Sequence, residues 1–285
     1  MSWLAQLFKS DAPPSVDWLD TAADSLIKAP RSPRLKADCR LHCFGTTTSV
    51  CDSSSTYGVW TLCEEVLTLK ERRPLVYSIG IGSAIGFDVS MVRSGARVRA
   101  FDPTITHEHF LRLVSHYRLT PVERARLTFQ PIGMASAEGM LPFFSLHAKG
   151  GGSLAVGERA NSAATGTAPP PAHKSAVQMH GLVARLPTLQ LLAGDANRTI
   201  DVLKIDIEGA EWPIFASRVP KWLRMRPPDQ IALELHERWR KDGKALRAAV
   251  HRNLRACGYV VRHNSTSGEE ILFVRTKDPT PACAA

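Results

Sequence analysis

Short apolar runs alternate with helix-forming segments from residue 74 onward, and this alternation restricts the fold more than any other feature. The run "PLVYSIGIG" ends in glycines and is typical of a buried parallel strand. A predicted helix, "SAIGFDVSMVRSG", follows it. Then come a second strand, "RVRAFDP", a second helix, "THEHFLRLVSHYRL", and a third strand, "RLTFQPIGM". This order predicts a parallel sheet covered by helices on both faces.

The end of the chain departs from the alternation. After "TIDVLKIDIEGAEWPIF", a strand running into a helix, come the strand "QIALELHE" and the helix "DGKALRAAVHRNLRACG". Two further runs, "YVVRHN" and "EEILFVRT", are separated only by the turn-forming "STSG", which predicts an antiparallel hairpin. The predicted fold class is therefore α/β, a Rossmann-like doubly wound sheet that is mostly parallel and has a C-terminal antiparallel hairpin strand.

Composition divides the chain into four parts. Residues 1–35 are rich in Pro, Ser and Asp and are expected to be a loosely ordered N-terminal segment. Residues 36–73 carry a cysteine cluster and are expected to form an N-terminal subdomain or lid. Residues 74–275 form the main domain, and residues 276–285 form a tail. A stretch at about 146–176 is full of Gly, Ala, Ser and Pro, which predicts a disordered insertion, with a moving substrate lid as the alternative.

A glycine-rich turn and an acid mark a candidate cofactor site. Gly80, Gly82 and Gly86 follow the first predicted strand and precede a helix, where glycine allows a tight turn and close approach to a ligand. Asp102 ends the second strand and can accept both hydroxyls of an adenosine ribose. Its alternative role is a helix N-cap. Together these residues indicate an adenosine-containing cofactor, without separating a nicotinamide from S-adenosylmethionine.

Acidic residues gather where two later strands end. In "DVLKIDIEGAEW", residues 201–212, Asp206 and Glu208 stand two apart at the end of an apolar run, so their side chains can share a face. Glu234 and His236 repeat this arrangement in "LELHE", on the strand expected beside it. Ligands bind outside the carboxyl ends of strands in open α/β sheets. We therefore expect these four ionisable groups to converge, whereas Glu211 is interpreted as an acid that starts a helix.

The order and spacing of five segments resemble class I S-adenosylmethionine-dependent methyltransferases of the FkbM-like and methyltransferase-like groups. The segments are "YSIGIG", "AFDPT", "FQPIG", "LKIDIEGAEW" and "LELH", and the resemblance covers residues 74–275. It implies that this part is a methyltransferase domain with the seven-stranded class I fold, and that S-adenosylmethionine is the cofactor. The implied cofactor-binding residues are Ser78, Gly80, Gly82, Gly86 and Asp102, with Ser78 standing where many such enzymes carry an acid.

This resemblance gives the acidic residues a chemical role. Asp206 or His236 would act as the base that takes a proton from a substrate hydroxyl, with Glu208 and Glu234 positioning it. A Mg²⁺ ion held by the same oxygen ligands is an alternative, although no metal is predicted. His236 alone could also be a core histidine.

The expected acceptor is a sugar or another small hydroxylated metabolite. The chain has no D/N-P-P-Y/F motif, which is typical of amino-group methylation, and no cysteine placed to attack a pyrimidine. Eleven Lys and Arg against four Asp and Glu lie between residues 218 and 255, which leaves an anionic acceptor or nucleic acid open but not favoured. An NAD(P)-dependent Rossmann oxidoreductase and a non-catalytic cofactor-binding module are the alternative functions.

The cysteines and the N-terminus bear on the compartment. Cys39, Cys43, Cys51 and Cys63 form no C-x-x-C pair, so we expect structural thiols, with a disulfide or a metal site as alternatives. "MSWLAQLFKS" is too short for a signal-peptide core, and no run of about 18 apolar residues predicts a transmembrane helix. A cytoplasmic location is therefore expected.

Overall fold

The computed structural model of the chain describes residues 39–45, 58–68, 72–145, 154–156, 178–276 and 278–283. The predicted N-terminal segment and most of the predicted insertion lie outside these residues, and so does Cys51.

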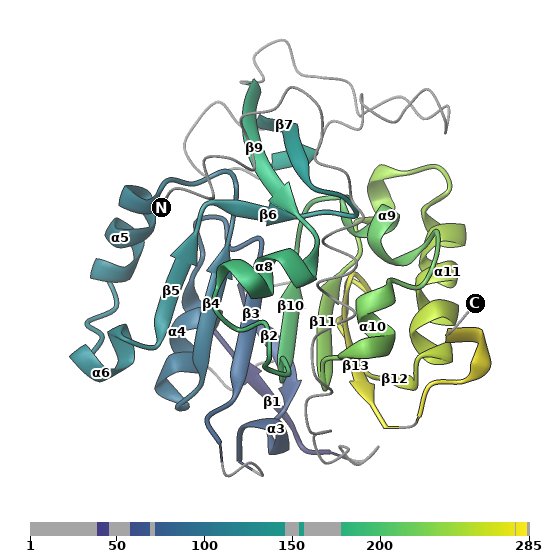
Figure 1. Cartoon of the computed structure of the whole chain (residues 1–285), viewed down its shortest axis with the longest axis horizontal. Helices are drawn as coiled ribbons and strands as arrows, with labels where there is room; N and C mark the ends of the chain where they lie inside the picture. The colour runs from purple at the N-terminus through teal and green to yellow at the C-terminus, as the bar shows by residue number, and fades with distance from the viewer. Residues whose placement is uncertain are drawn as a thin grey trace.

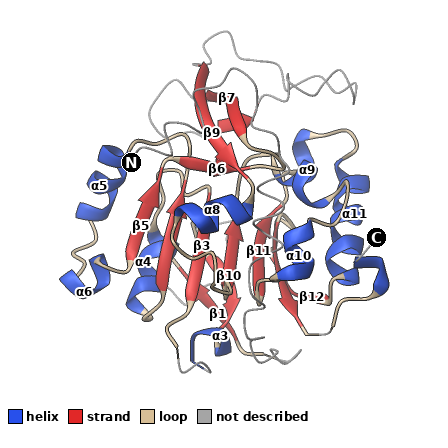
Figure 2. Cartoon of the chain, in the orientation of Figure 1, coloured by secondary structure: helices blue, strands red, loops and turns tan. Residues whose placement is uncertain are grey.

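Seven strands form the main sheet, in the order β12-β13-β11-β10-β3-β4-β5 (Figure 1, Figure 2). These strands are β3 (Leu75–Ile79), β4 (Arg97–Phe101), β5 (Leu127–Gln130), β10 (Val202–Ile205), β11 (Gln230–Glu234), β12 (Tyr259–Asn264) and β13 (Glu270–Arg275). Neighbouring strands are parallel from β11 through β5, and β13 is antiparallel to both β11 and β12. The prediction of a mostly parallel sheet with a C-terminal antiparallel hairpin strand is confirmed.

Helices cover both faces of the sheet because its central strands are buried on both sides. One face packs against α4 (Gly86–Arg93) and α5 (His107–Ser115), and α6 (Pro121–Arg124) follows α5. The other face packs against α8 (Leu186–Leu192), α9 (Glu211–Phe215), α10 (Lys221–Met225) and α11 (Gly243–Ala256). Figure 1 shows α8 and α10 in front of the sheet and α4 behind it. Within the described residues, no helix is long and apolar enough to cross a membrane.

A hairpin from the cysteine-containing region joins the main core. It consists of β1 (Leu41–Phe44) and β2 (Trp60–Cys63), and α3 (Glu65–Thr68) follows it. Phe44, Trp60 and Leu62 are buried in the same hydrophobic cluster as Val76 and Phe87 of the main domain. The buried amide of Gln230 bonds both the backbone N–H and the carbonyl of Cys63, which ties β2 to β11. The described part of region 36–73 therefore shares one core with the main sheet.

The expectation of structural thiols is wrong. Cys39 is bonded to Cys63, and Cys257 at the end of α11 is bonded to Cys283 in a short C-terminal turn, η3 (Pro281–Cys283). Cys43 is also disulfide-bonded, and no described cysteine is free. The register of β1 and β2 explains the first bridge, since it pairs Leu41 with Cys63 and so brings Cys39 close.

A second, smaller sheet follows β5. The predicted third strand is split at Pro131 into β5 and β6 (Ile132–Met134), because proline has no N–H for a sheet hydrogen bond. The small sheet has the order β6-β9-β7-β8, with β7 (Gly139–Ser145), β8 (Leu154–Val156) and β9 (Gln178–Ala184). It lies at the edge of the main sheet where β3, β4 and β5 end (Figure 1).

Candidate active site

The glycine turn after β3 is pressed against the end of β10. Gly80 and Gly82 have φ angles of 74° and 51°, in the left-handed region that favours glycine. A Cβ atom on Gly80 would lie 1.6 Å from the carbonyl oxygen of Asp206, so no larger residue fits there. At Gly80 and Gly82 the turn therefore has no side chain between its backbone and the space at the carboxyl edge of the sheet. A cofactor loop requires this, because its backbone must approach the ligand closely.

Asp102 is buried at the end of β4 and closes this turn. Its Oδ2 accepts a hydrogen bond from the Gly82 N–H at 2.8 Å, and its Oδ1 accepts from the N–H of Thr104 at 2.8 Å. The helix α5 begins later, with Thr106 as its N-cap, so Asp102 is not a helix cap. The hydroxyl of Thr104 also donates to Oδ1, so Asp102 accepts three hydrogen bonds from the protein. A carboxylate has about four lone-pair sites, which leaves about one of them for a ribose hydroxyl.

The structure also locates the other two glycine-loop residues of the sequence prediction. Ser78 is fully buried on β3, beside Lys204 of β10 in the sheet register. Gly86 is the first residue of α4, and a Cβ there would lie 2.9 Å from the carbonyl oxygen of Gly45. Gly86 is thus needed for close packing of the N-terminal hairpin on α4, and any contact of these two residues with a cofactor remains a prediction.

The four predicted ionisable groups do converge at the carboxyl ends of β10 and β11. The Nε2 atom of His236 lies 3.0 Å from Glu208, 3.4 Å from Glu234 and 3.9 Å from Asp206. Glu208 adopts a φ of 57°, which is uncommon and costly for a residue other than glycine. Glu208 stands three residues after the end of β10, and both it and Asp206 face the Nε2 atom of the imidazole.

Glu211 holds the histidine from the other side. It is fully buried as the first residue of α9, and its Oε1 accepts from both the backbone N–H and the Nδ1 of His236, at 3.0 and 2.9 Å. Its Oε2 accepts from the N–H of Gly209 at 2.8 Å. Glu211 starts a helix as expected, but it also fixes the ring of His236, which sequence reasoning missed.

The carboxylates control the charge of His236. Burial alone would lower the pKa of this histidine, but the carboxylates of Glu208 and Glu211, each within 3.0 Å of one ring nitrogen, outweigh burial and raise the pKa well above 6.5. Burial, followed by the nearby charge of Asp206, raises the pKa of Glu234 to about 9. At neutral pH, His236 is therefore a cation and Glu234 keeps its proton.

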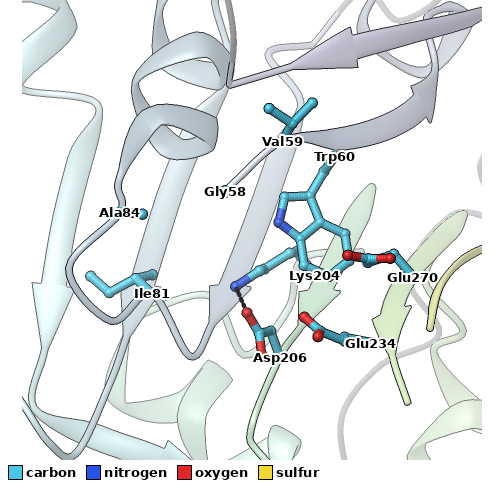
Figure 3. Close-up of a pocket in the computed structure, with 9 residues that line it drawn as sticks. All are labelled: Gly58, Val59, Trp60, Ile81, Ala84, Lys204, Asp206, Glu234 and Glu270. Carbon is cyan, nitrogen blue, oxygen red and sulfur yellow. Dashed lines mark ion pairs between the residues drawn. The ribbon is translucent and has the colours of Figure 1, made fainter. Parts of the chain in front are cut away.

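A small cavity opens beside this cluster (Figure 3). It has a volume of about 70 Å³, and Asp206, Glu234 and Glu270 lie toward one side of it. Trp60 and Val59 of the N-terminal hairpin form another wall, and Lys204 reaches in from β10 toward Asp206 (Figure 3). The cavity is large enough for one functional group of a ligand rather than for a whole molecule.

The cluster also has the composition of a cation site. Asp206, Glu234 and His236 each offer one ligand atom, and these atoms lie within 4.8 Å of one another. Oxygen ligands suit Mg²⁺, and two of the three candidate ligands are carboxyl groups.

Lys204, Trp60 and Glu270 were missed because their roles depend on distant contacts. Trp60 and Glu270 reach the cavity from β2 and β13, far from the acidic motif in sequence. Lys204 could have been recognised from the sequence, because a lysine inside the apolar run "VLKI" must be either exposed to solvent or paired with other polar groups.

The chain is similar to known methyltransferases. The model of the methyltransferase FkbM domain matches residues 80–261, more than half of the chain. The probable methyltransferase-like protein 24 of Homo sapiens is 23% identical over 194 aligned positions, and the match covers 66% of this chain and 41% of that protein, so the chain spans less than half of this relative. The crystal structure of methyltransferase FkbM from Methylobacillus flagellatus KT matches 71% of this chain and 43% of its own, with 12% identity and a TM-score of 0.41. The chain belongs to the FkbM methyltransferase family.

Proposed function

We propose that the chain is an S-adenosylmethionine-dependent methyltransferase that methylates a hydroxyl oxygen of a sugar or another small hydroxylated metabolite. The observation that carries this proposal is the position of Asp206. Its backbone carbonyl touches the glycine turn, while its carboxyl group lines the cavity beside Glu234. One residue thus lies at both the candidate cofactor loop and the candidate acceptor cavity.

The cofactor loop fits an adenosine-containing ligand. The bare turn at Gly80 and Gly82 and the buried carboxylate of Asp102 lie at the carboxyl ends of adjacent parallel strands. This is where open α/β sheets hold the ribose and the chain attached to it. When bound, S-adenosylmethionine would supply an electrophilic methyl group.

Asp206 fits the role of general base better than His236. A protonated imidazole has no lone pair with which to accept a proton, and the pKa of His236 is raised well above its usual value. The protonated Glu234 can instead donate a hydrogen bond within the cavity. In this assignment Asp206 takes the hydroxyl proton as the acceptor oxygen attacks, and His236 and Glu208 fix the geometry around it.

The cavity lining favours a neutral hydroxylated acceptor. Apart from the protonated Glu234, its lining has the carboxyl groups of Asp206 and Glu270 and one lysine, so an anionic group would meet like charges there. Trp60 offers an apolar surface next to these polar groups, which is a combination suited to a sugar or a similar polyol.

The disulfides support a different compartment from the one expected. Disulfides form and persist in oxidising compartments and are rare in the cytosol. We therefore infer that this chain folds in an oxidising compartment, and the cytoplasmic expectation is not carried forward.

Isothermal titration calorimetry tests the cofactor. We expect S-adenosylmethionine and S-adenosylhomocysteine to bind the wild-type protein, NADH not to bind, and Asp102→Ala to weaken binding of both at least tenfold. Binding of NADH alone would replace the methyltransferase assignment with an oxidoreductase. Absence of all binding would favour a non-catalytic module. Repeating the titration after chelation of divalent cations tests the Mg²⁺ alternative.

Activity of Asp206→Asn tests the base. With labelled S-adenosylmethionine and a panel of sugars and polyols, kcat should fall about 10²–10⁴-fold, the usual contribution of a general base. The affinity for S-adenosylhomocysteine should stay within a few-fold of the wild-type value, because the asparagine keeps the shape of the side chain. A kcat near the wild-type value would remove Asp206 from this role.

A further inference from the structure

A buried lysine connects the two halves of the candidate site. Lys204 lies on the central strand β10, and only 4% of it is exposed. Its neighbours Leu203 and Ile205 point to the opposite face and pack in the apolar core under α8 and α9. Lys204 points to the side of the N-terminal hairpin, where its Nζ lies 5.1 Å from the centre of the Trp60 ring.

The ammonium group lies at the junction of three parts of the structure. It donates to the carbonyl oxygen of Gly80 at 2.5 Å and lies 3.4 Å from that of Ile79, where β3 passes into the glycine turn. It also forms an ion pair with Oδ2 of Asp206 at 3.5 Å, which Figure 3 marks with a dashed line. Lys204 therefore touches the cofactor loop, the proposed base and the aromatic wall of the cavity.

Burial of the Lys204 ammonium group destabilises the folded chain unless neighbouring groups replace its hydration. An ammonium group taken out of water loses several kcal/mol of solvation unless carbonyls and carboxylates replace the water. Methionine or leucine would fill an apolar strand position without this cost. The structure instead provides two carbonyls, one carboxylate and an indole ring around a single ammonium group.

We propose that Lys204 is a positioning residue that locks the glycine turn to Asp206, so that the cofactor loop and the base keep a fixed separation. This inference rests on the proposed function of the site. A hydrogen bond from Lys204 holds the Gly80 carbonyl inward, which keeps the turn open for the ligand. The same ammonium group draws the Asp206 carboxylate toward the loop, because opposite charges 3.5 Å apart attract strongly at low solvent exposure.

Neutral substitution tests the lock. In Lys204→Met the alkyl stem is kept and the charge is lost, and Lys244→Met, on the exposed side of α11, is the matched control. We expect the dissociation constant for S-adenosylhomocysteine to rise at least tenfold in Lys204→Met and kcat to fall at least tenfold, while the control stays within twofold of wild type. Calorimetry gives the dissociation constant without any acceptor.

Chemical rescue separates positioning from a merely structural role. In Lys204→Ala the vacated space can admit propylammonium, which restores the cation, and 1-propanol serves as the neutral control of the same size. Saturable recovery of cofactor affinity with propylammonium, and not with 1-propanol, is the expected result.

Each other outcome overturns the inference. Wild-type affinity and kcat in Lys204→Met would show that the lysine positions nothing, while the proposed function would stand. Equal rescue by both additives, no rescue, or failure of both variants to fold would assign Lys204 a structural role. If the wild-type protein itself binds neither S-adenosylmethionine nor S-adenosylhomocysteine, the proposed function fails together with this inference.

Discussion

Removing one disulfide at a time should reveal how much each bridge stabilises the chain. The two described bridges form a matched pair, since their sequence separations are 24 and 26 residues. Each also includes one fully buried sulfur, from Cys63 and from Cys257. The double variants Cys39→Ala/Cys63→Ala and Cys257→Ala/Cys283→Ala therefore remove loops of nearly equal length from similar surroundings.

The expected loss follows from the loop length. For a closed loop of about 25 residues, the chain-entropy relation gives a stabilisation of about 3.5 kcal/mol at 25 °C, and two more residues change it by less than about 0.1 kcal/mol. The first loop also contains Cys43, which is itself disulfide-bonded, so its free length is shorter and about 3.5 kcal/mol is its upper value. The C-terminal variant should thus lose at least as much free energy of unfolding as the N-terminal one.

Urea unfolding followed by circular dichroism measures both losses. The activity readout should separate the two variants, because only the N-terminal bridge fixes the strand that carries Trp60 into the cavity. We expect a raised KM for the acceptor in Cys39→Ala/Cys63→Ala and an unchanged KM in the other variant. Losses below about 1 kcal/mol in both variants would refute the loop-closure reasoning. Free thiols in the denatured, unreduced wild-type protein would refute the pairing itself.

Two substitutions in the ionisable cluster give further predictions. Glu234→Gln should remove a pH dependence of stability. The pKa of Glu234 is about 9 in the folded protein and 4.5 in the unfolded chain, so the folded protein binds more protons between these values. The stability of the wild type therefore falls as pH rises from 4.5 to 9. In denaturant titrations, the free energy of unfolding of the variant should rise by up to about 4 kcal/mol relative to that of the wild type between pH 5 and pH 8. If the free energies of the two proteins depend on pH in the same way, the prediction is wrong. Glu211→Ala should lower the free energy of unfolding by about 3–5 kcal/mol at pH 7, because the buried His236 loses the carboxylate that accepts hydrogen bonds from its ring and its backbone. Urea unfolding measures this loss, and a value under about 1 kcal/mol would show that Glu211 is not needed for stability.

The central part of the fold could be predicted because local sequence and global topology agree there. The apolar runs around Val76 and Leu203 are too short and too continuous for helices, and each is followed by a helix. Parallel strands then align their carboxyl ends at one edge. That rule brings Asp206 to Glu234 and His236, across about 30 residues of sequence, and the left-handed turn at Glu208 adds the fourth group.

The remaining features depend on contacts that no local pattern encodes. The pairing of Cys39 with Cys63 follows from a hairpin register, and the pairing of Cys257 with Cys283 from the return of the C-terminus to α11. The small sheet of β6 to β9 is interrupted by low-complexity sequence, which hides its strands. The role of Glu211 was missed because a helix-starting acid and a histidine-fixing acid look alike in sequence.

Within the cluster of ionisable groups, the surroundings of each side chain, rather than its residue type, decide which role it can take. His236 lies between Glu208 and Glu211 and is held as a cation. Glu234, largely buried and close to Asp206, keeps its proton, whereas Asp206 lies beside the ammonium group of Lys204. Burial is the main reason that Glu234 keeps its proton, since it does so although the cationic His236 lies 3.4 Å away. Asp206 differs in that the ammonium group of Lys204 lies 3.5 Å from its carboxyl group. Such a difference is what separates a proton acceptor from a hydrogen-bond donor in one small cavity. It also gives the lysine of the acidic motif a part in the proposed function: without Lys204, the carboxyl group of the proposed base Asp206 would lose the cation that lies 3.5 Å from it.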